Sequence, residues 1–256
     1  MTASFLYGFR IPAENLKGKI NEEGALTEEC PYGKIRIKGY ALESQHQEKE
    51  ITMNNNETKW DKLLRIKTSG RDDSRADQYR YPYEPTPYSV LESLANAGYI
   101  GKKNTLVDYG CGKGRADFFL SYQTRCRSIG IEYDDRIYQS ATENQKTAAS
   151  AGRTMFLLEN AETYIVPAEA DRFYFFNPFS VEILQSVIGR IMESYYEEPR
   201  EMLLFFYYPS NEYISYLMTV DELTFMDEID CRELFDGDDA RERIVIFEVV
   251  GISTTM

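Results

Sequence analysis

The string VDYGCGKGR, which begins at Val107, places three glycines on alternate positions behind an acidic residue. Asp108 precedes Gly110, Gly112 and Gly114, and a short apolar run leads into them. Glycine is costly in backbone entropy, so this concentration indicates a loop that some group approaches closely. A carboxylate beside bare backbone suits a bulky ligand that carries a positive charge. The alternative is a tight structural turn with no ligand.

Two further polar positions follow later apolar runs. Glu132 ends the run SIGIE, and a carboxylate at such a strand end can accept hydrogen bonds from both hydroxyls of a ribose. The next run leads into Asn160 and Ala161, for which the alternative is a simple loop cap. Ligands of open α/β sheets bind at the carboxyl ends of the strands, so these residues are expected to share one site with Asp108.

A fourth string, FYFFNPFS, places Asn177, Pro178 and Phe179 behind another apolar run. This position again corresponds to the ligand-binding edge of the predicted sheet. The alternative is that Asn177 and Pro178 only cap the helix that follows.

Short apolar runs alternate with helix-like stretches from residue 105 to residue 208. Strands are predicted at 105–109, 128–132, 154–158, 172–176 and 202–208, and helices near 116–122, 135–151 and 180–196. This alternation predicts parallel strands with right-handed crossovers, hence an α/β fold with helices on both faces of a sheet. The segments DELTFMDEIDC and ERIVIFEVVG, separated by an Asp-Gly turn, predict a terminal antiparallel pair.

Composition argues against several other classes of protein. The 256 residues carry a net charge of −13, with one histidine and four cysteines that form no C-x-x-C pair. A disulfide framework, a metal site and a Ser-His-Asp triad are therefore not expected. The acidic balance disfavours a broad nucleic-acid surface. With no signal sequence and no apolar run near the ~18 residues of a membrane helix, no membrane partner and a cytoplasmic location are expected.

The string D-x-G-x-G-x-G resembles motif I of the class I, Rossmann-like S-adenosylmethionine-dependent methyltransferases. The order of the four strings resembles that family over roughly residues 104–210, and the chain as a whole is similar to bacterial members. The resemblance implies a mostly parallel seven-stranded sheet, S-adenosylmethionine as methyl donor and S-adenosylhomocysteine as product. The residues that it places at the cofactor are Asp108, Gly110, Cys111, Gly112, Gly114, Glu132, Tyr133, Asn160, Ala161, Asn177, Thr86 and Tyr88.

Asn177, Pro178 and Phe179 resemble motif IV, which in amino-group methyltransferases reads Asp/Asn/Ser-Pro-Pro-Tyr/Phe. In that motif a side-chain oxygen and a backbone carbonyl accept hydrogen bonds from a planar amino group, and the aromatic ring stacks on it. The resemblance therefore implies these three as catalytic residues for methyl transfer, most simply to nitrogen. Protein side chains and small amines rank above nucleic acid as acceptors.

Two departures keep other functions open. The chain has one proline where motif IV has two, which leaves a non-catalytic sensor or regulatory subunit that binds the donor as an alternative. A NAD-dependent dehydrogenase is a weaker alternative, because Arg115 stands where the dinucleotide motif G-x-G-x-x-G requires its third glycine.

Residues 1–81 lack this alternation and are interpreted as an N-terminal extension of a core domain over residues 82–256. Within the extension, the string MNNNETKW suggests a polar loop. The string from Tyr79 to Tyr88, YRYPYEPTPY, is predicted to fold across the mouth of the cofactor site as a lid. The alternative is a proline-fixed linker that packs on the core.

Overall fold

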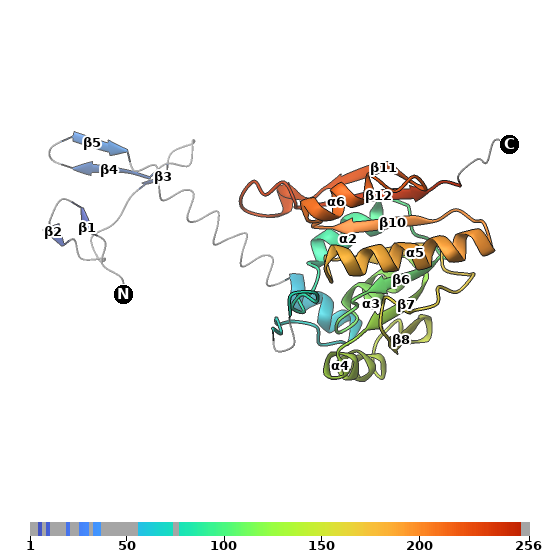
Figure 1. The fold of residues 1–256 in the computed structure, drawn as a ribbon. Helices are drawn as coiled ribbons and strands as arrows, with labels where there is room; N and C mark the ends of the chain where they lie inside the picture. Colours follow the sequence, from blue (N-terminus) through green and yellow to red (C-terminus); the bar gives the residue numbers. More distant parts are fainter. Residues whose placement is uncertain are drawn as a thin grey trace. The chain divides into compact units, whose positions relative to one another are not determined.

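The computed structural model describes residues 56–73 and 77–251, together with five short strands within residues 1–53 (Figure 1). Contacts divide the chain into two units, Met1–Met53 and Asn54–Met256. The strands of the first unit are β1 (Phe5–Leu6), β2 (Phe9–Arg10), β3 (Lys19–Ile20), β4 (Leu26–Cys30) and β5 (Gly33–Arg36). β1 pairs with β2, and β4 pairs with both β3 and β5, all antiparallel. The single histidine, His46, lies outside the described residues.

The division falls ahead of the boundary near residue 81 that the sequence suggested, because residues from 56 onward pack with the second unit. Residues 56–64 form a helix, so the predicted polar loop is wrong over residues 56–60. Leu64 is fully buried, and the Trp60 ring meets Phe119 edge-on with 4.9 Å between ring centroids. Phe119 lies far from Trp60 in the sequence, so local periodicity gives no sign of this contact.

The second unit is built on one seven-stranded sheet. Its strands are β6 (Thr105–Tyr109), β7 (Arg127–Glu132), β8 (Thr154–Leu158), β9 (Arg172–Phe175), β10 (Leu203–Tyr207), β11 (Leu223–Asp230) and β12 (Arg243–Val249). Their order across the sheet is β11-β12-β10-β9-β6-β7-β8. Pairings from β10 to β8 are parallel, whereas β12 is antiparallel to both of its neighbours. The predicted mostly parallel sheet with a terminal antiparallel pair is therefore confirmed, and β12 alone runs against the other strands.

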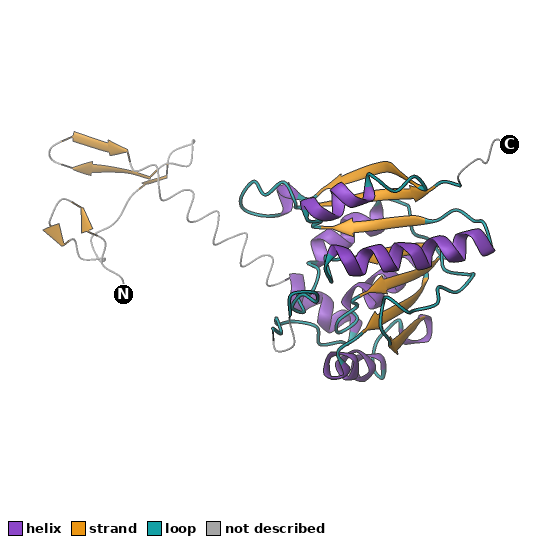
Figure 2. Cartoon of the chain, viewed as in Figure 1, coloured by secondary structure: helices purple, strands orange, loops and turns teal. Residues whose placement is uncertain are grey.

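Helices cover both faces of this sheet (Figure 2). They are α2 (Tyr88–Asn96), α3 (Arg115–Thr124), α4 (Asp135–Gln145), α5 (Val181–Glu197) and α6 (Asn211–Leu217), with 3-10 turns η2 (Ala151–Arg153) and η3 (Arg232–Leu234). α4 ends at Gln145, before the expected residue 151. The chain then passes through a turn into η2. The sequence analysis missed α6.

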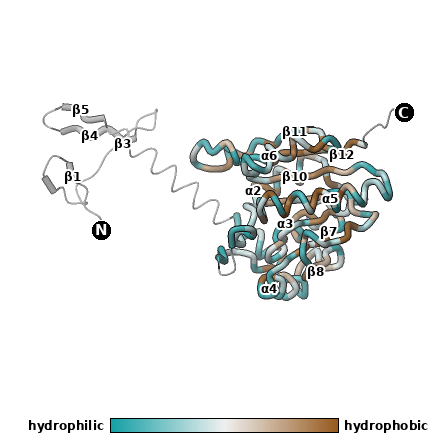
Figure 3. The backbone as a smooth tube through the Cα atoms, viewed as in Figure 1, coloured by the Kyte–Doolittle hydropathy of each residue, from teal (hydrophilic) through white to brown (hydrophobic). Residues whose placement is uncertain are grey.

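Two apolar clusters hold the layers together, one on each face of the sheet. One joins alternate residues of β9 and β10 to α5, and the other joins the opposite residues to α2 and α3. The β6 and β10 strands are buried at every position, as expected for a parallel sheet with both faces covered. Apolar stretches accordingly run through the sheet and α5 (Figure 3). No helix within 56–73 and 77–251 is long and apolar enough to cross a membrane.

Candidate functional site

A cavity lies at the carboxyl ends of β6, β7, β8 and β9. Eight of the twelve residues predicted at the cofactor line it: Thr86, Asp108, Gly110, Cys111, Glu132, Tyr133, Asn160 and Ala161. Pro178 and Phe179 line it as well. The carboxyl groups of Asp108 and Glu132 thus belong to one cavity, on two neighbouring strands, as the sequence predicted.

Glu132 is held at the end of β7 by three backbone amides. One carboxylate oxygen accepts from Gly112 at 2.9 Å, and the other accepts from Tyr133 and Asp134, each at 2.9 Å. A carboxylate has about four lone-pair sites, so these bonds fix its orientation and leave capacity for a ligand hydroxyl. Burial raises the pKa of Glu132, and the three amides act in the opposite direction.

Asp108 is deeply buried on β6, with 3% of its surface exposed, yet it reaches the cavity wall. Burial, followed by the charge of Asp117, raises the pKa of Asp108 well above its usual range. A buried carboxyl of this kind gains from a cationic partner, because the partner offsets the desolvation of its charged form.

Amides of the glycine loop donate hydrogen bonds to other groups of the protein. The amides of Gly110 and Cys111 both donate to the Ile131 carbonyl, and Gly114 donates to Cys111. Together with the bond from Gly112 to Glu132, four amides of the loop are engaged. A pyrophosphate site at a helix N-terminus relies on free amides that point at the ligand. The loop therefore suits a ligand that lies against backbone better than one that carries a pyrophosphate.

All three motif glycines have positive φ, and at each of them another segment approaches closely. A Cβ on Gly110 would lie 2.5 Å from the Cβ of Pro178, and a Cβ on Gly112 would lie 2.2 Å from the Tyr83 ring. Gly112 and Gly114 do not line the cavity, and Gly114 instead packs under Phe118 and Phe156. Part of the glycine requirement is thus structural packing.

We expect Gly112→Ala to lower the free energy of unfolding by about 1–3 kcal/mol, since the methyl group would overlap the Tyr83 ring at a left-handed φ. Denaturant unfolding measures this change. The matched control is Gly152→Ala, where nothing lies within 4 Å of the added Cβ and the stability should stay within about 0.5 kcal/mol. Equal stabilities of the two variants would contradict this packing.

Asn177 adopts a left-handed conformation with φ 44° at the end of β9. Its side-chain oxygen is buried and has no hydrogen-bond partner among the described residues. A buried acceptor without a donor is costly, and a water molecule or a ligand group would satisfy it. Asn177 itself is not among the lining residues, although Phe176 and Pro178 on either side of it are.

Residues 77–86 lie directly along the Asn177–Phe179 string. The Tyr81 amide donates to the Pro178 carbonyl at 3.2 Å, and the Ser180 amide donates to the Tyr79 carbonyl at 2.8 Å. Arg80 stacks over the Tyr133 ring, 4.2 Å from its centroid. This segment closes one side of the cavity, where the sequence analysis placed a lid.

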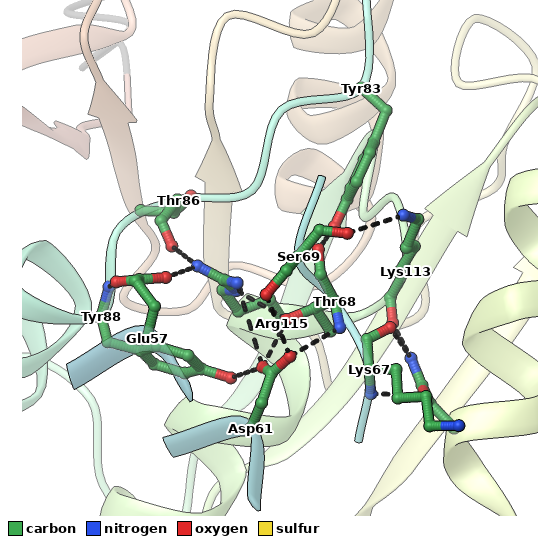
Figure 4. A network of polar contacts seen from close by, with 11 residues as sticks. Glu57, Asp61, Lys67, Thr68, Ser69, Tyr83, Thr86, Tyr88, Lys113 and Arg115 are labelled. Carbon is green, nitrogen blue, oxygen red and sulfur yellow. Dashed lines mark hydrogen bonds and ion pairs between the residues drawn. The ribbon is translucent and has the colours of Figure 1, made fainter. Parts of the chain in front are cut away.

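Arg115 links the helix after the glycine loop to residues 56–88 (Figure 4). Its side chain is 4% exposed and forms an ion pair with Glu57. Its Nε donates to the Thr68 hydroxyl at 2.7 Å, and its guanidinium lies 4.4 Å from the Tyr88 ring centroid. The Tyr88 hydroxyl donates to Asp61 at 2.6 Å, so Tyr88 belongs to this network and not to the cavity lining.

The cavity includes residues that the sequence analysis did not propose. Those that carry a polar or charged group and lie outside the predicted lid are Asp72, Arg115, Asp134, Glu159 and Tyr174. Asp134 caps α4 by accepting from the Arg136 amide, and its position two residues after Glu132 is a signal that could have found it. Asp72 is placed by backbone bonds with Tyr83, and nothing local in the sequence indicates that pairing.

No protein-family model and no curated protein matches the chain. Among solved structures, it is similar in fold to an RNA methyltransferase from Salinibacter ruber in complex with S-adenosyl-L-homocysteine, at 17% identity and a TM-score of 0.45, over 65% of this chain and 94% of that one. An rRNA methylase from Streptococcus thermophilus matches at 15% identity and a TM-score of 0.47, over 66% and 98%. The mitomycin 7-O-methyltransferase MmcR matches at 14% identity and a TM-score of 0.49, over 63% and 53%.

Proposed function

We propose that this protein is an S-adenosylmethionine-dependent methyltransferase that acts on a nitrogen nucleophile. The observation that carries the proposal is the single cavity shared by Asp108, the glycine loop and Glu132. The same cavity is bounded by Pro178 and Phe179. A binding site for an amino-acid nucleoside thus adjoins a string that resembles motif IV.

The residues present fit S-adenosylmethionine on three counts. Asp108 offers a carboxyl to the methionine ammonium, Glu132 has acceptor capacity for a ribose hydroxyl, and Gly110 exposes backbone to the cavity. Asn160 and Ala161 line the part of the cavity beyond β8, where the adenine edge is expected. When bound, the donor supplies an activated methyl group.

This chain's own contribution to the reaction is orientation. Asn177 stands between two residues that line the cavity, and rotation of its side chain would bring the unpartnered oxygen to a substrate amino group and aim the nitrogen lone pair. Phe179 and Phe176 offer aromatic faces to a ring or to positive charge. The nitrogen attacks through its lone pair, so an acceptor that arrives as a cation must first release a proton to water.

The charges around the cavity bear on the class of acceptor. Six carboxyl groups line it, those of Asp72, Glu84, Asp108, Glu132, Asp134 and Glu159, against the two guanidinium groups of Arg80 and Arg115. A guanidinium nitrogen of Arg80 lies 3.7 Å from a carboxylate oxygen of Asp77, and Arg115 forms an ion pair with Glu57. Such a lining favours cations over phosphates. We therefore keep basic protein side chains and small amines ahead of nucleic acid as acceptors, in a cytoplasmic setting.

Calorimetric titration tests the donor site. We expect S-adenosylhomocysteine to bind and NAD to give no heat, because the amides of the loop are engaged and Arg115 replaces the third glycine of the dinucleotide motif. Heat with NAD alone would favour the dehydrogenase alternative. Incubation of a lysate with labelled donor, followed by protease, nuclease and size fractionation, then identifies the acceptor class.

Replacing Asn177 tests the nitrogen assignment. Asn177→Gly removes the acceptor while keeping a residue that tolerates positive φ, and Asn177→Asp keeps an acceptor. We expect the glycine variant to transfer label about tenfold more slowly, as for one lost hydrogen bond, with unchanged affinity for S-adenosylhomocysteine. The aspartate variant should retain most of the rate. Equal rates in the glycine variant and the wild type would remove Asn177 from catalysis.

A second candidate function is binding of the donor without catalysis. The observation in its favour is that the Pro178 carbonyl already accepts from Tyr81, while Phe179 is 5% exposed. A motif IV carbonyl would have to accept from a substrate amino group as well. Binding of S-adenosylhomocysteine with no labelled product in any lysate fraction would support this candidate.

A further inference from the structure

Asp117 is a buried carboxyl with no role in the site described so far. It lies in the first turn of α3, and none of its surface is exposed. One of its oxygens accepts from the Ser128 hydroxyl at 2.5 Å. The other oxygen is buried and meets no hydrogen-bond donor among the described residues. An ionised carboxylate left in this state would be costly.

The side chain of Asp117 interacts with the carboxyl of Asp108. Asp108 stands beside Gly130 in the parallel pairing of β6 with β7, and Ser128 lies two residues earlier on the same face of β7. α3 packs on this face and brings Asp117 within hydrogen-bonding reach of Asp108. Two carboxylates cannot bond to each other, so a hydrogen bond between them requires a proton on one of the two.

We propose that Asp108 and Asp117 share protons as one unit, and that a cationic ligand group binding beside Asp108 expels a proton from this pair to solvent. The O–H bond of a carboxylic acid breaks, its electron pair remains on the carboxylate, and the proton passes to water. Asp117 is a positioning residue, since it acts on the ligand only through Asp108. The identity of the cation, a methionine ammonium, rests on the proposed function.

Burial of the two carboxyls favours the protonated form of the pair. It raises the pKa of Asp117 to about 7 and raises the pKa of Asp108 well above its usual range, and the Ser128 hydroxyl opposes the shift at Asp117. The other titratable groups that face the pair are Glu132 on β7, Cys111 in the glycine loop, Cys126 before β7 and Tyr174 on β9. Burial keeps the thiols and the phenol neutral, so Glu132 is the one competing source of charge in this set.

The sign of the pH dependence follows from linkage. A cation binds best to the ionised pair, so the affinity for S-adenosylhomocysteine should rise by about threefold to tenfold between pH 6 and pH 8. Calorimetry in buffers of different ionisation enthalpy should detect net proton release near pH 7. Asp117→Asn removes one titrating group while keeping a donor for Asp108, and should flatten the rise. Ser128→Ala removes a donor to Asp117 and should move the rise to higher pH.

Three outcomes overturn the proposal: equal affinity at pH 6 and pH 8, absence of proton release, or an unchanged slope in Asp117→Asn. The last outcome would assign the slope to Glu132.

If S-adenosylhomocysteine binds at no pH, the proposed function fails. The pH dependence of protein stability then tests the carboxyl pair without a ligand. The pKa values of Asp108 and Asp117 are higher in the folded protein than the value of about 4 in the unfolded chain. Their protonation therefore stabilises the folded protein below pH 4, and this stability is lost as pH rises through the folded pKa values. The melting temperature of the wild type relative to Asp117→Asn should therefore fall from pH 5 to pH 8, and a constant difference would overturn the pair.

Discussion

Arg115→Ala is expected to lower the free energy of unfolding by about 3–5 kcal/mol, the range for breaking one side of a buried ion pair. The side chain is 4% exposed, and its removal leaves the carboxylates of Glu57 and Asp61 without their buried cation. It also removes a donor to Thr68 and the cation that faces the Tyr88 ring. Urea unfolding measures the loss.

Two variants sharpen this test. Arg115→Lys keeps the charge but lacks the planar fork that reaches several partners, so an intermediate loss is expected. Arg190→Ala is the matched control, because Arg190 is 40% exposed and pairs with Glu193 one helical turn away. Its loss should stay below about 1 kcal/mol. A loss of that small size for Arg115→Ala would contradict the role of Arg115 as the anchor of residues 56–88.

Glu132→Ala is expected to weaken binding of S-adenosylhomocysteine by about 5-fold to 150-fold, equivalent to about 1–3 kcal/mol for lost hydrogen bonds to a charged group. The change removes the acceptor for a ribose hydroxyl and also frees the amide of Gly112 from the carboxylate that orders the loop. Asp108→Ala should weaken binding to a similar extent, through the loss of the partner for the ammonium.

The control for charge is Glu159→Gln, because Glu159 lines the same cavity but is exposed to solvent. Its affinity should stay within about twofold of the wild type, since solvent screens an exposed charge. Calorimetric titration measures all three variants. Wild-type affinity in both Glu132→Ala and Asp108→Ala would remove the site assignment.

The sequence predicted the sheet and the two carboxylates because both depend on local patterns. Buried parallel strands read as short apolar runs, and the carboxyl ends of such strands meet at one edge. That rule predicts Asp108, Glu132 and Asn160 at one edge of the sheet, and all three line the cavity. Tyr133 was predicted from the family resemblance and also lines it.

The features that sequence reasoning missed depend on contacts between distant segments. The family resemblance placed Tyr88 at the cofactor, yet Asp61 and Arg115 hold it in a buried network. The pairing of Asp117 with Asp108 is another example, because an acidic residue in the first turn of a helix usually faces solvent and favours the helix dipole. Its burial depends on the register of β7 and not on α3 alone.

The contacts of the residues before the core could not be predicted from the sequence. Their helix at 56–64 carries few apolar residues, and its value to the fold lies in Glu57 and Asp61, which reach Arg115 across the chain. The bond between Tyr81 and Pro178 likewise joins segments almost a hundred residues apart. Neither pairing leaves a periodic signal in the sequence.

A crystal structure with bound S-adenosylhomocysteine tests the central claim most directly. The account predicts the ammonium of the ligand at the carboxyl of Asp108 and a ribose hydroxyl at that of Glu132, with the chain of the ligand lying against Gly110. A ligand bound elsewhere, or one whose ribose and ammonium contact neither carboxyl, would contradict the account.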